Sequence, residues 1–75
     1  MKMIKNNCTM ICVKLRNDGF NEFGILSNIP KKILIRHIEN LNLDIDLYIN
    51  FLLDYKYLEN NINGYRLTGI DLYEI

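Results

Sequence analysis

The chain has no alanine, glutamine or tryptophan, and its 75 residues include one proline, one histidine and two cysteines. Asn, Ile, Lys and Tyr are abundant instead. These residues have AT-rich codons, so the composition indicates a gene from an AT-rich genome, such as that of a virus or a mobile element. A structural zinc site needs four ligands, and Cys8, Cys12 and His37 cannot supply them alone. We expect both cysteines to be reduced, buried apolar residues, and we expect no cofactor or metal.

Long apolar runs and catalytic motifs are missing as well. No stretch approaches the roughly 20 apolar residues of a membrane span. The apolar run after the basic residues 1–5 is too short and too interrupted for a signal peptide. No glycine-rich phosphate loop, nucleophile elbow or pair of catalytic acids is visible. We therefore expect a cytoplasmic, non-catalytic protein without a membrane partner.

The chain also lacks a net charge, since nine Lys and Arg residues balance nine Asp and Glu residues. A neutral chain is a poor candidate for a generic polyanion binder. The charges are nevertheless separated along the sequence. Residues 1–40 carry seven Lys/Arg against three acids, and residues 41–75 carry two against six. This asymmetry indicates an interaction surface.

The length fits one domain that spans residues 1–75. A chain of this size buries only about 60% of the surface that its unfolded form exposes. The core must therefore be rich in large apolar residues, and 49% of the chain is hydrophobic. Homodimerisation would bury further surface, so a homodimer is one expected partner arrangement.

Residues 8–16 fit two local structures. Apolar and polar residues alternate there, as in a strand that turns at residues 17–19 and pairs back over residues 20–26. The same residues also fit a first helix that is capped at Asn7 and ends at Gly19. The local pattern leaves both interpretations open.

The centre of the chain predicts a helix over residues 31–41. Cap-type residues at 27–28 precede Pro30, whose fixed φ suits a first helical turn. Apolar residues then fall on one helix face and polar residues on another. The apolar face consists of Leu34, Ile35, Ile38 and Leu41.

A second helix is predicted from Asp44 to about Tyr55, with Asn42 or Asp44 as its cap. Residues 41–47 alternate with period two, as a strand would. Residues 47–53 break that alternation, so the helix is favoured.

The last third of the chain predicts a hairpin. Asn63-Gly64 is a strong turn signal between two short strands. Thr68 is then expected to cap a short terminal element that ends at residues 72–75.

From about residue 30 to residue 70 the order of these elements resembles the winged helix-turn-helix superfamily. Gly64-Tyr65-Arg66-Leu67-Thr68 is similar to its returning wing strand. The resemblance implies an α+β fold, a small winged helix of three helices with a two- or three-stranded antiparallel wing sheet. It therefore favours the helix over residues 8–16. Two departures are Lys56, where a glycine usually precedes the wing strand, and Gly69 directly after Thr68.

The resemblance implies DNA binding through the second predicted helix, but that helix is acidic. A DNA-reading helix offers Arg, Lys, Asn or Gln to base edges and cations to phosphates, whereas aspartates are repelled. We therefore predict a surface for a protein partner, for which a solvated helix side is the simpler alternative. The predicted partner-binding residues are Asp46, Leu47, Asn50, Phe51 and Asp54.

A DNA-binding transcriptional regulator is the alternative function. Its nucleic-acid-binding residues would be Lys31, Lys32, Arg36 and, in the wing, Arg66. A different assignment, in which residues 20–28 are helical, would make residues 31–41 the recognition helix. The simpler interpretation of these cations is a solvated helix face with Arg36 near Glu39. The favoured function is a small regulatory protein that binds and modulates a protein partner.

Overall fold

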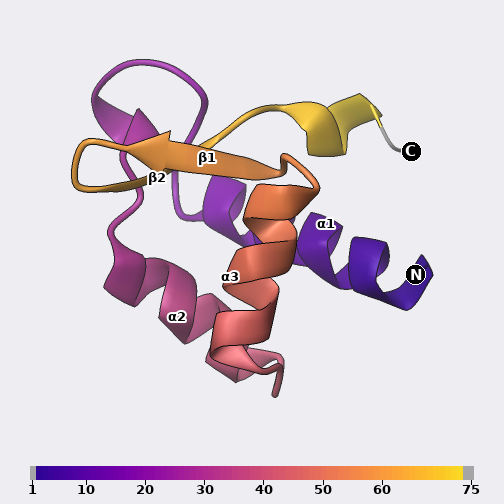
Figure 1. Cartoon of the computed structure of the whole chain (residues 1–75). Helices are drawn as coiled ribbons and strands as arrows, with labels where there is room; N and C mark the ends of the chain where they lie inside the picture. The colour runs from indigo at the N-terminus through magenta and orange to yellow at the C-terminus, as the bar shows by residue number, and fades with distance from the viewer. Residues whose placement is uncertain (1, 74–75) are drawn as a thin grey trace.

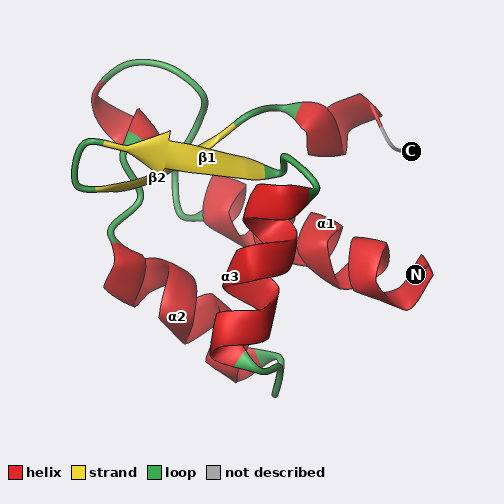
Figure 2. Cartoon of the chain, in the orientation of Figure 1, coloured by secondary structure: helices red, strands yellow, loops and turns green. Residues whose placement is uncertain are grey.

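The computed structural model describes residues 2–73 and has the expected small α+β, winged-helix-like fold (Figure 1). Three helices pack beneath one antiparallel hairpin, which is the only sheet in the described part of the chain (Figure 2). The elements in order are α1 (Lys2–Asn17), η1 (Ile25–Ser27), α2 (Lys31–Asn40), α3 (Ile45–Asp54), β1 (Leu58–Asn61), β2 (Gly64–Leu67) and η2 (Ile70–Tyr73).

Residues 8–16 belong to α1, so the helical interpretation is confirmed and the strand is wrong. The helix starts at Lys2 rather than at Asn7. Asn7 is not a cap, because its side-chain amide donates a hydrogen bond to the Tyr48 hydroxyl at 3.0 Å. Cys8, Ile11, Cys12 and Leu15 form the buried face, as the 3.6-residue period requires.

The segment between α1 and α2 is neither the returning strand at 20–26 nor the alternative helix at 20–28. It contains only the single 3₁₀ turn η1. Gly19 and Gly24 have φ values of 101° and 79°, a left-handed conformation that suits glycine and interrupts regular structure. α3 is therefore the helix in the recognition position, as the main assignment predicted.

α2 begins at Lys31 as predicted, but not by the predicted capping. Pro30 itself occupies the N-cap position, and no side chain caps the helix. The preceding residues have another role, because Ile29 forms an antiparallel bridge with Tyr65 of β2. That bridge requires extended backbone immediately before the helix. At its other end α2 stops at Asn40, one residue before the predicted boundary.

Asp44, one of the two predicted caps, begins α3 by accepting a hydrogen bond from the Leu47 backbone N–H at 2.9 Å. Asn42 instead adopts a left-handed φ of 58° in the turn between the helices. Leu47 is exposed, but over residues 41–46 the period-two alternation is visible in the burial, where apolar residues are partly covered and polar residues are exposed. It runs through a helix end, a turn and a helix start, so it does not indicate a strand.

We expect Asp44→Ala to lower the free energy of unfolding by about 1 kcal/mol, because one N–H of the first turn of α3 loses its acceptor. Asp46→Ala is the matched control. It removes a carboxylate from the same turn without removing a cap, so its effect should be smaller. Urea denaturation measures both values. Equal losses would show that the charge, and not the hydrogen bond, stabilises this helix start.

The hairpin is confirmed, but its turn lies one residue earlier than the Asn-Gly signal suggested. Asn61 pairs with Gly64, so Ile62 and Asn63 form the loop and Gly64 begins β2. Gly64 lies against Ile29, and a Cβ at this position would be 2.0 Å from the Ile29 carbonyl oxygen. Glycine is therefore needed here for close backbone approach rather than for the turn.

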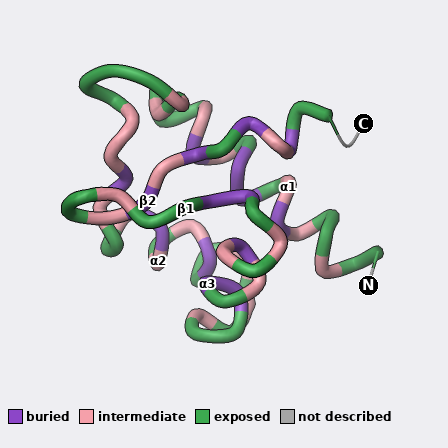
Figure 3. Tube along the Cα trace, turned by 45° about the horizontal axis from the view of Figure 1, so that its top comes forward, coloured by how far each residue is buried: buried purple, intermediate pink, exposed green. Residues whose placement is uncertain are grey.

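The core lies between the three helices and the inner face of the hairpin (Figure 3). Cys8 and Cys12 are fully buried in it, as expected. Its largest fully buried side chains are Tyr57, Ile11, Leu15, Ile29, Leu34, Ile38, Leu52, Leu58 and Leu67. Within residues 2–73, no helix combines the length and the apolarity needed to cross a membrane.

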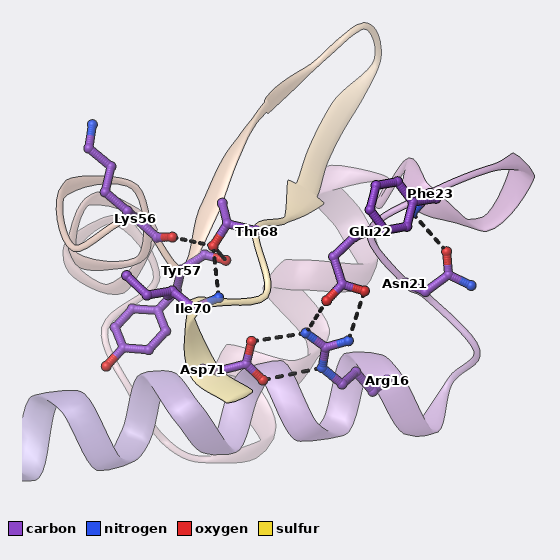
Figure 4. Close-up of polar contacts among 9 residues, drawn as sticks. All are labelled: Arg16, Asn21, Glu22, Phe23, Lys56, Tyr57, Thr68, Ile70 and Asp71. Carbon is purple, nitrogen blue, oxygen red and sulfur yellow. Dashed lines mark hydrogen bonds and ion pairs between the residues drawn. The ribbon is translucent and has the colours of Figure 1, made fainter. Parts of the chain in front are cut away.

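Thr68 caps η2 as predicted (Figure 4). Its hydroxyl accepts a hydrogen bond from the Ile70 N–H at 3.3 Å and lies within hydrogen-bond distance of the carbonyl oxygens of Lys56 and Tyr57. This one side chain therefore ties the end of α3 to the end of β2. The predicted continuation of the terminal element to Glu74 and Ile75 lies outside the described residues.

Candidate interaction surface

The outer side of α3 forms a continuous exposed surface, which we call the acidic α3 face. It consists of Asp46, Leu47, Asn50 and Asp54, all of which are exposed. The opposite side of the helix is buried through Tyr48, Ile49 and Leu52. The helical period that produces the core face therefore also gathers these four predicted residues on one open surface.

Phe51, the fifth predicted residue, lies at the edge of this face and is half-buried. Its ring stacks on Tyr55 with 5.9 Å between the centroids. It also meets Tyr48 edge-on at 5.3 Å. These contacts hold the ring against the core, so Phe51 supports the face and Leu47 supplies its exposed apolar area.

The two aspartates of the face have no ion-pair partner among residues 2–73. Other acids do have partners: Asp18 meets His37 at 2.5 Å, and Glu59 pairs with Arg66. His37 is therefore held in a structural contact. Because no cation neutralises Asp46 or Asp54 inside the described chain, the acidic α3 face presents a negative potential to any molecule that approaches it.

A groove adjoins the C-terminal end of this face, where α3 meets the hairpin. It encloses about 430 Å³ and is lined by Leu53, Asp54, Lys56, Leu58, Glu59, Asn60 and Thr68. Asp54 belongs to both the groove and the acidic α3 face. Lys56 lies in the left-handed region with φ 66°, a conformation that glycine adopts more readily than other residues. The groove therefore extends the surface past the end of the helix.

The cations of the alternative DNA surface lie on two elements, α2 and the hairpin. Lys31, Lys32 and Arg36 are exposed on α2, and no ion pair joins Arg36 to Glu39 among the described residues. Arg66 is engaged with Glu59 on the hairpin. It lines a second pocket of about 230 Å³ whose walls are Glu22, Phe23, Glu59, Arg66, Leu67 and Thr68. None of the α2 cations lines that pocket.

Sequence reasoning missed a charge cluster at the end of α1 (Figure 4). Arg16 donates hydrogen bonds to both Glu22 and Asp71, and Asp71 is 4% exposed. These bonds hold the pKa of Glu22 below its ordinary value and raise the pKa of Arg16. All three charges are satisfied inside the cluster, so its role is structural.

Sequence reasoning also missed an exposed apolar loop. Phe23, Ile25 and Leu26 are 82%, 97% and 52% exposed beside the hairpin. No periodic pattern marks them, because the loop has no regular structure to impose one. Among residues 2–73, no group of three or more His, Cys, Asp or Glu side chains is arranged to hold a metal ion.

Comparison of the chain with protein-family models, with curated proteins and with solved structures finds no match. The functional interpretation therefore depends on the chemistry of the surface itself.

Proposed function

We propose that the protein is a non-catalytic regulatory protein that binds a protein partner through the acidic α3 face. The observation that supports this proposal is the pair Asp46 and Asp54, which are exposed and without ion pairs in the described chain on the helix in the recognition position. Duplex DNA carries one negative charge per about 1.7 Å of its axis. Two aspartates without ion pairs among the described residues would be repelled by it, whereas a basic protein surface would be attracted.

The face also specifies the partner's chemistry. Asp46 and Asp54 are eight residues apart, which corresponds to about 12 Å along the helix axis. Leu47 lies beside them and is 48% exposed. A complementary surface would place Lys or Arg at about this separation around an apolar residue. The charges would then govern association rate and specificity, and the apolar contact would add buried area.

We expect peptides selected from a displayed random library on the immobilised protein to carry Lys or Arg on either side of an apolar residue. Replacing both aspartates (Asp46→Asn with Asp54→Asn) should weaken the selected peptides about tenfold, since two exposed charge pairs together contribute about 1–2 kcal/mol. The matched control is Glu39→Gln on α2, which removes an exposed acid elsewhere. Selected peptides without basic residues, or equal binding to the double variant, would contradict the proposal.

DNA binding remains the second candidate function, because Lys31, Lys32 and Arg36 are exposed and have no ion pair among the described residues. Fluorescence anisotropy with a mixed duplex pool separates the two candidates. Phosphate contacts would give binding that weakens steeply with salt and that Lys32→Glu reduces. Absence of binding at low salt, where electrostatic attraction is strongest, would leave protein binding as the remaining candidate function.

We also propose that the protein is a member of the winged-helix superfamily and that a virus or a mobile element encodes it. The order of α2, α3 and the hairpin supports the former. The AT-rich codon usage implied by Asn, Ile, Lys and Tyr supports the latter. A small winged helix that has exchanged basic for acidic residues on α3 would act by occupying a surface on another protein.

A further inference from the structure

α1 has a second apolar surface, on the side away from the core. Met3, Met10 and Val13 are 75%, 46% and 47% exposed. Their spacings of seven and three residues place them on one side of the helix. They form a stripe about 15 Å long, at 1.5 Å per residue. Cys8, Ile11 and Leu15 project from the other side into the core.

This stripe has positive borders. α1 contains Lys2, Lys5, Lys14 and Arg16 and no acidic residue. At 3.6 residues per turn, Lys2 and Lys14 flank the stripe on its two sides, whereas Arg16 is committed to Glu22 and Asp71. Neither Lys2 nor Lys14 has an ion pair among residues 2–73. We call Lys2, Met3, Met10, Val13 and Lys14 the basic α1 face.

The basic α1 face complements the acidic α3 face. The first has an apolar stripe between lysines, and the second has Leu47 beside Asp46 and Asp54. The two helices pack against each other through their buried sides, and α3 passes in front of α1 (Figure 1). Their exposed sides therefore point away from the core in different directions. Within one molecule the two faces cannot meet, but in two copies they can.

We propose that the basic α1 face of one copy binds the acidic α3 face of a second copy. This inference rests on the proposed function, because it names the chain itself as a partner of the acidic α3 face. It also accounts for the basic and acidic halves of a chain whose net charge is zero. A symmetric pairing of two α1 faces would instead bring lysines against lysines, which is repulsive.

The contact joins two different surfaces, so each added copy leaves one face of each kind open. Such head-to-tail contacts form rings or chains rather than closed two-fold dimers. The basic α1 face covers about 3.6 helical turns and the acidic α3 face about 2.5 turns, which is small compared with a stable interface. The association should therefore be weak, dependent on concentration and sensitive to salt.

Sedimentation velocity at increasing protein concentration and low salt tests this proposal. The wild-type chain should form species larger than a dimer, and high salt should dissociate them. Two reversal variants should each be monomeric under the same conditions: Asp46→Lys with Asp54→Lys, and Lys2→Glu with Lys14→Glu. An equimolar mixture of the two should associate, because each supplies the face that the other lacks. Either reversal alone should raise the apparent dissociation constant at least about tenfold.

The control is a charge exchange on α2, Lys32→Glu with Glu39→Lys, which should associate like the wild type. Circular dichroism confirms that every variant is folded. A wild-type chain that stays monomeric at low salt would overturn the inference. So would association that the α3 reversal leaves unchanged, because the acidic α3 face would then take no part in the contact. Binding of phosphatidylserine vesicles that the α1 reversal abolishes, without self-association, would assign that face to a membrane and would also overturn it.

The proposed function does not require that the chain associate with itself. If the wild-type chain is monomeric but selected basic peptides still depend on Asp46 and Asp54, the acidic α3 face binds another protein. If peptide binding does not depend on these aspartates but both reversals weaken self-association, the acidic α3 face binds a second copy of the chain and not another protein. The two experiments therefore separate the two proposals.

Discussion

Arg16→Met should lower the free energy of unfolding by about 3–5 kcal/mol, which is the usual effect of removing one partner from a buried ion pair. The Asp71 side chain is 2% exposed and would remain buried without its cation. Methionine keeps the apolar stem of arginine, so the change isolates the charge. A domain of this size has a total stability near the low end of about 5–15 kcal/mol, and the variant should therefore be largely unfolded on mild heating.

The geometry explains why one residue has so large an effect. The guanidinium donates to the two Glu22 carboxylate oxygens at 3.1 and 2.8 Å. It donates to the two Asp71 oxygens at 3.2 and 3.0 Å (Figure 4). Arg16 therefore joins the last turn of α1 to the following loop and to η2. Its loss would release both segments and leave two carboxylates facing each other.

A double variant provides the control. Arg16→Met combined with Asp71→Asn removes the buried charge together with its partner, so it should be more stable than Arg16→Met alone. Urea denaturation of the two single variants, the double variant and the wild type gives the coupling free energy. A loss below about 1 kcal/mol for Arg16→Met would show that the cluster behaves like an ordinary surface ion pair.

The contact between Arg16 and Glu22 should also make the stability of the fold depend on pH. Arg16 lowers the pKa of Glu22 in the folded protein, below its ordinary value of 4.5. Ionised Glu22 therefore stabilises the fold at pH values above 4.5, and this contribution disappears as the pH falls through the folded-state pKa. Denaturation midpoints measured from neutral to acidic pH should fall in the wild type. The Arg16→Met variant should lose this part of the slope.

Local patterns in the sequence were sufficient for the helices and for most of the candidate surface. The apolar period of residues 45–54 fixes both the core side of α3 and its outer side, so the exposure of Asp46, Asn50 and Asp54 could be predicted. Asp44 could be predicted as a cap, because capping depends on residues three positions apart. Phe51 was the exception, since its burial depends on aromatic contacts with Tyr48 and Tyr55.

Contacts between distant segments could not be predicted in the same way. Arg16 and Asp71 are 55 residues apart, and nothing near Asp71 distinguishes a buried carboxylate from a solvated one. The groove beside α3 also depends on how the hairpin packs against the helix, so no local pattern indicated that Lys56, Glu59 and Thr68 line one groove. Residues 27–30 were interpreted as a helix cap. Their role in the bridge from Ile29 to Tyr65 could not be predicted, because that bridge joins residues far apart in the chain.

Gly64→Ala should lower the free energy of unfolding by about 3–5 kcal/mol. The new Cβ would lie 2.0 Å from the Ile29 carbonyl oxygen and 2.9 Å from its carbon, so one backbone segment must move. Movement breaks the bridge in which Ile29 and Tyr65 exchange hydrogen bonds of 2.7 and 3.0 Å. Two lost backbone bonds at about 1 kcal/mol each, with the strain of overpacking at about 1–3 kcal/mol, give this magnitude.

Gly24→Ala separates steric overlap from backbone conformation. Gly24 has no atom within 4 Å of an added Cβ, and its φ of 79° and ψ of −158° lie in a region that is open essentially to glycine alone, so its replacement should cost only backbone strain of about 1–3 kcal/mol. Gly64 has no such positive φ, and its cost should be steric alone. Urea denaturation gives both values, and hydrogen exchange at the Ile29 and Tyr65 amides should accelerate only in Gly64→Ala. Protected amides in that variant would mean that the hairpin and the segment before α2 move together and keep the bridge, and the expected loss of two backbone hydrogen bonds would then be wrong.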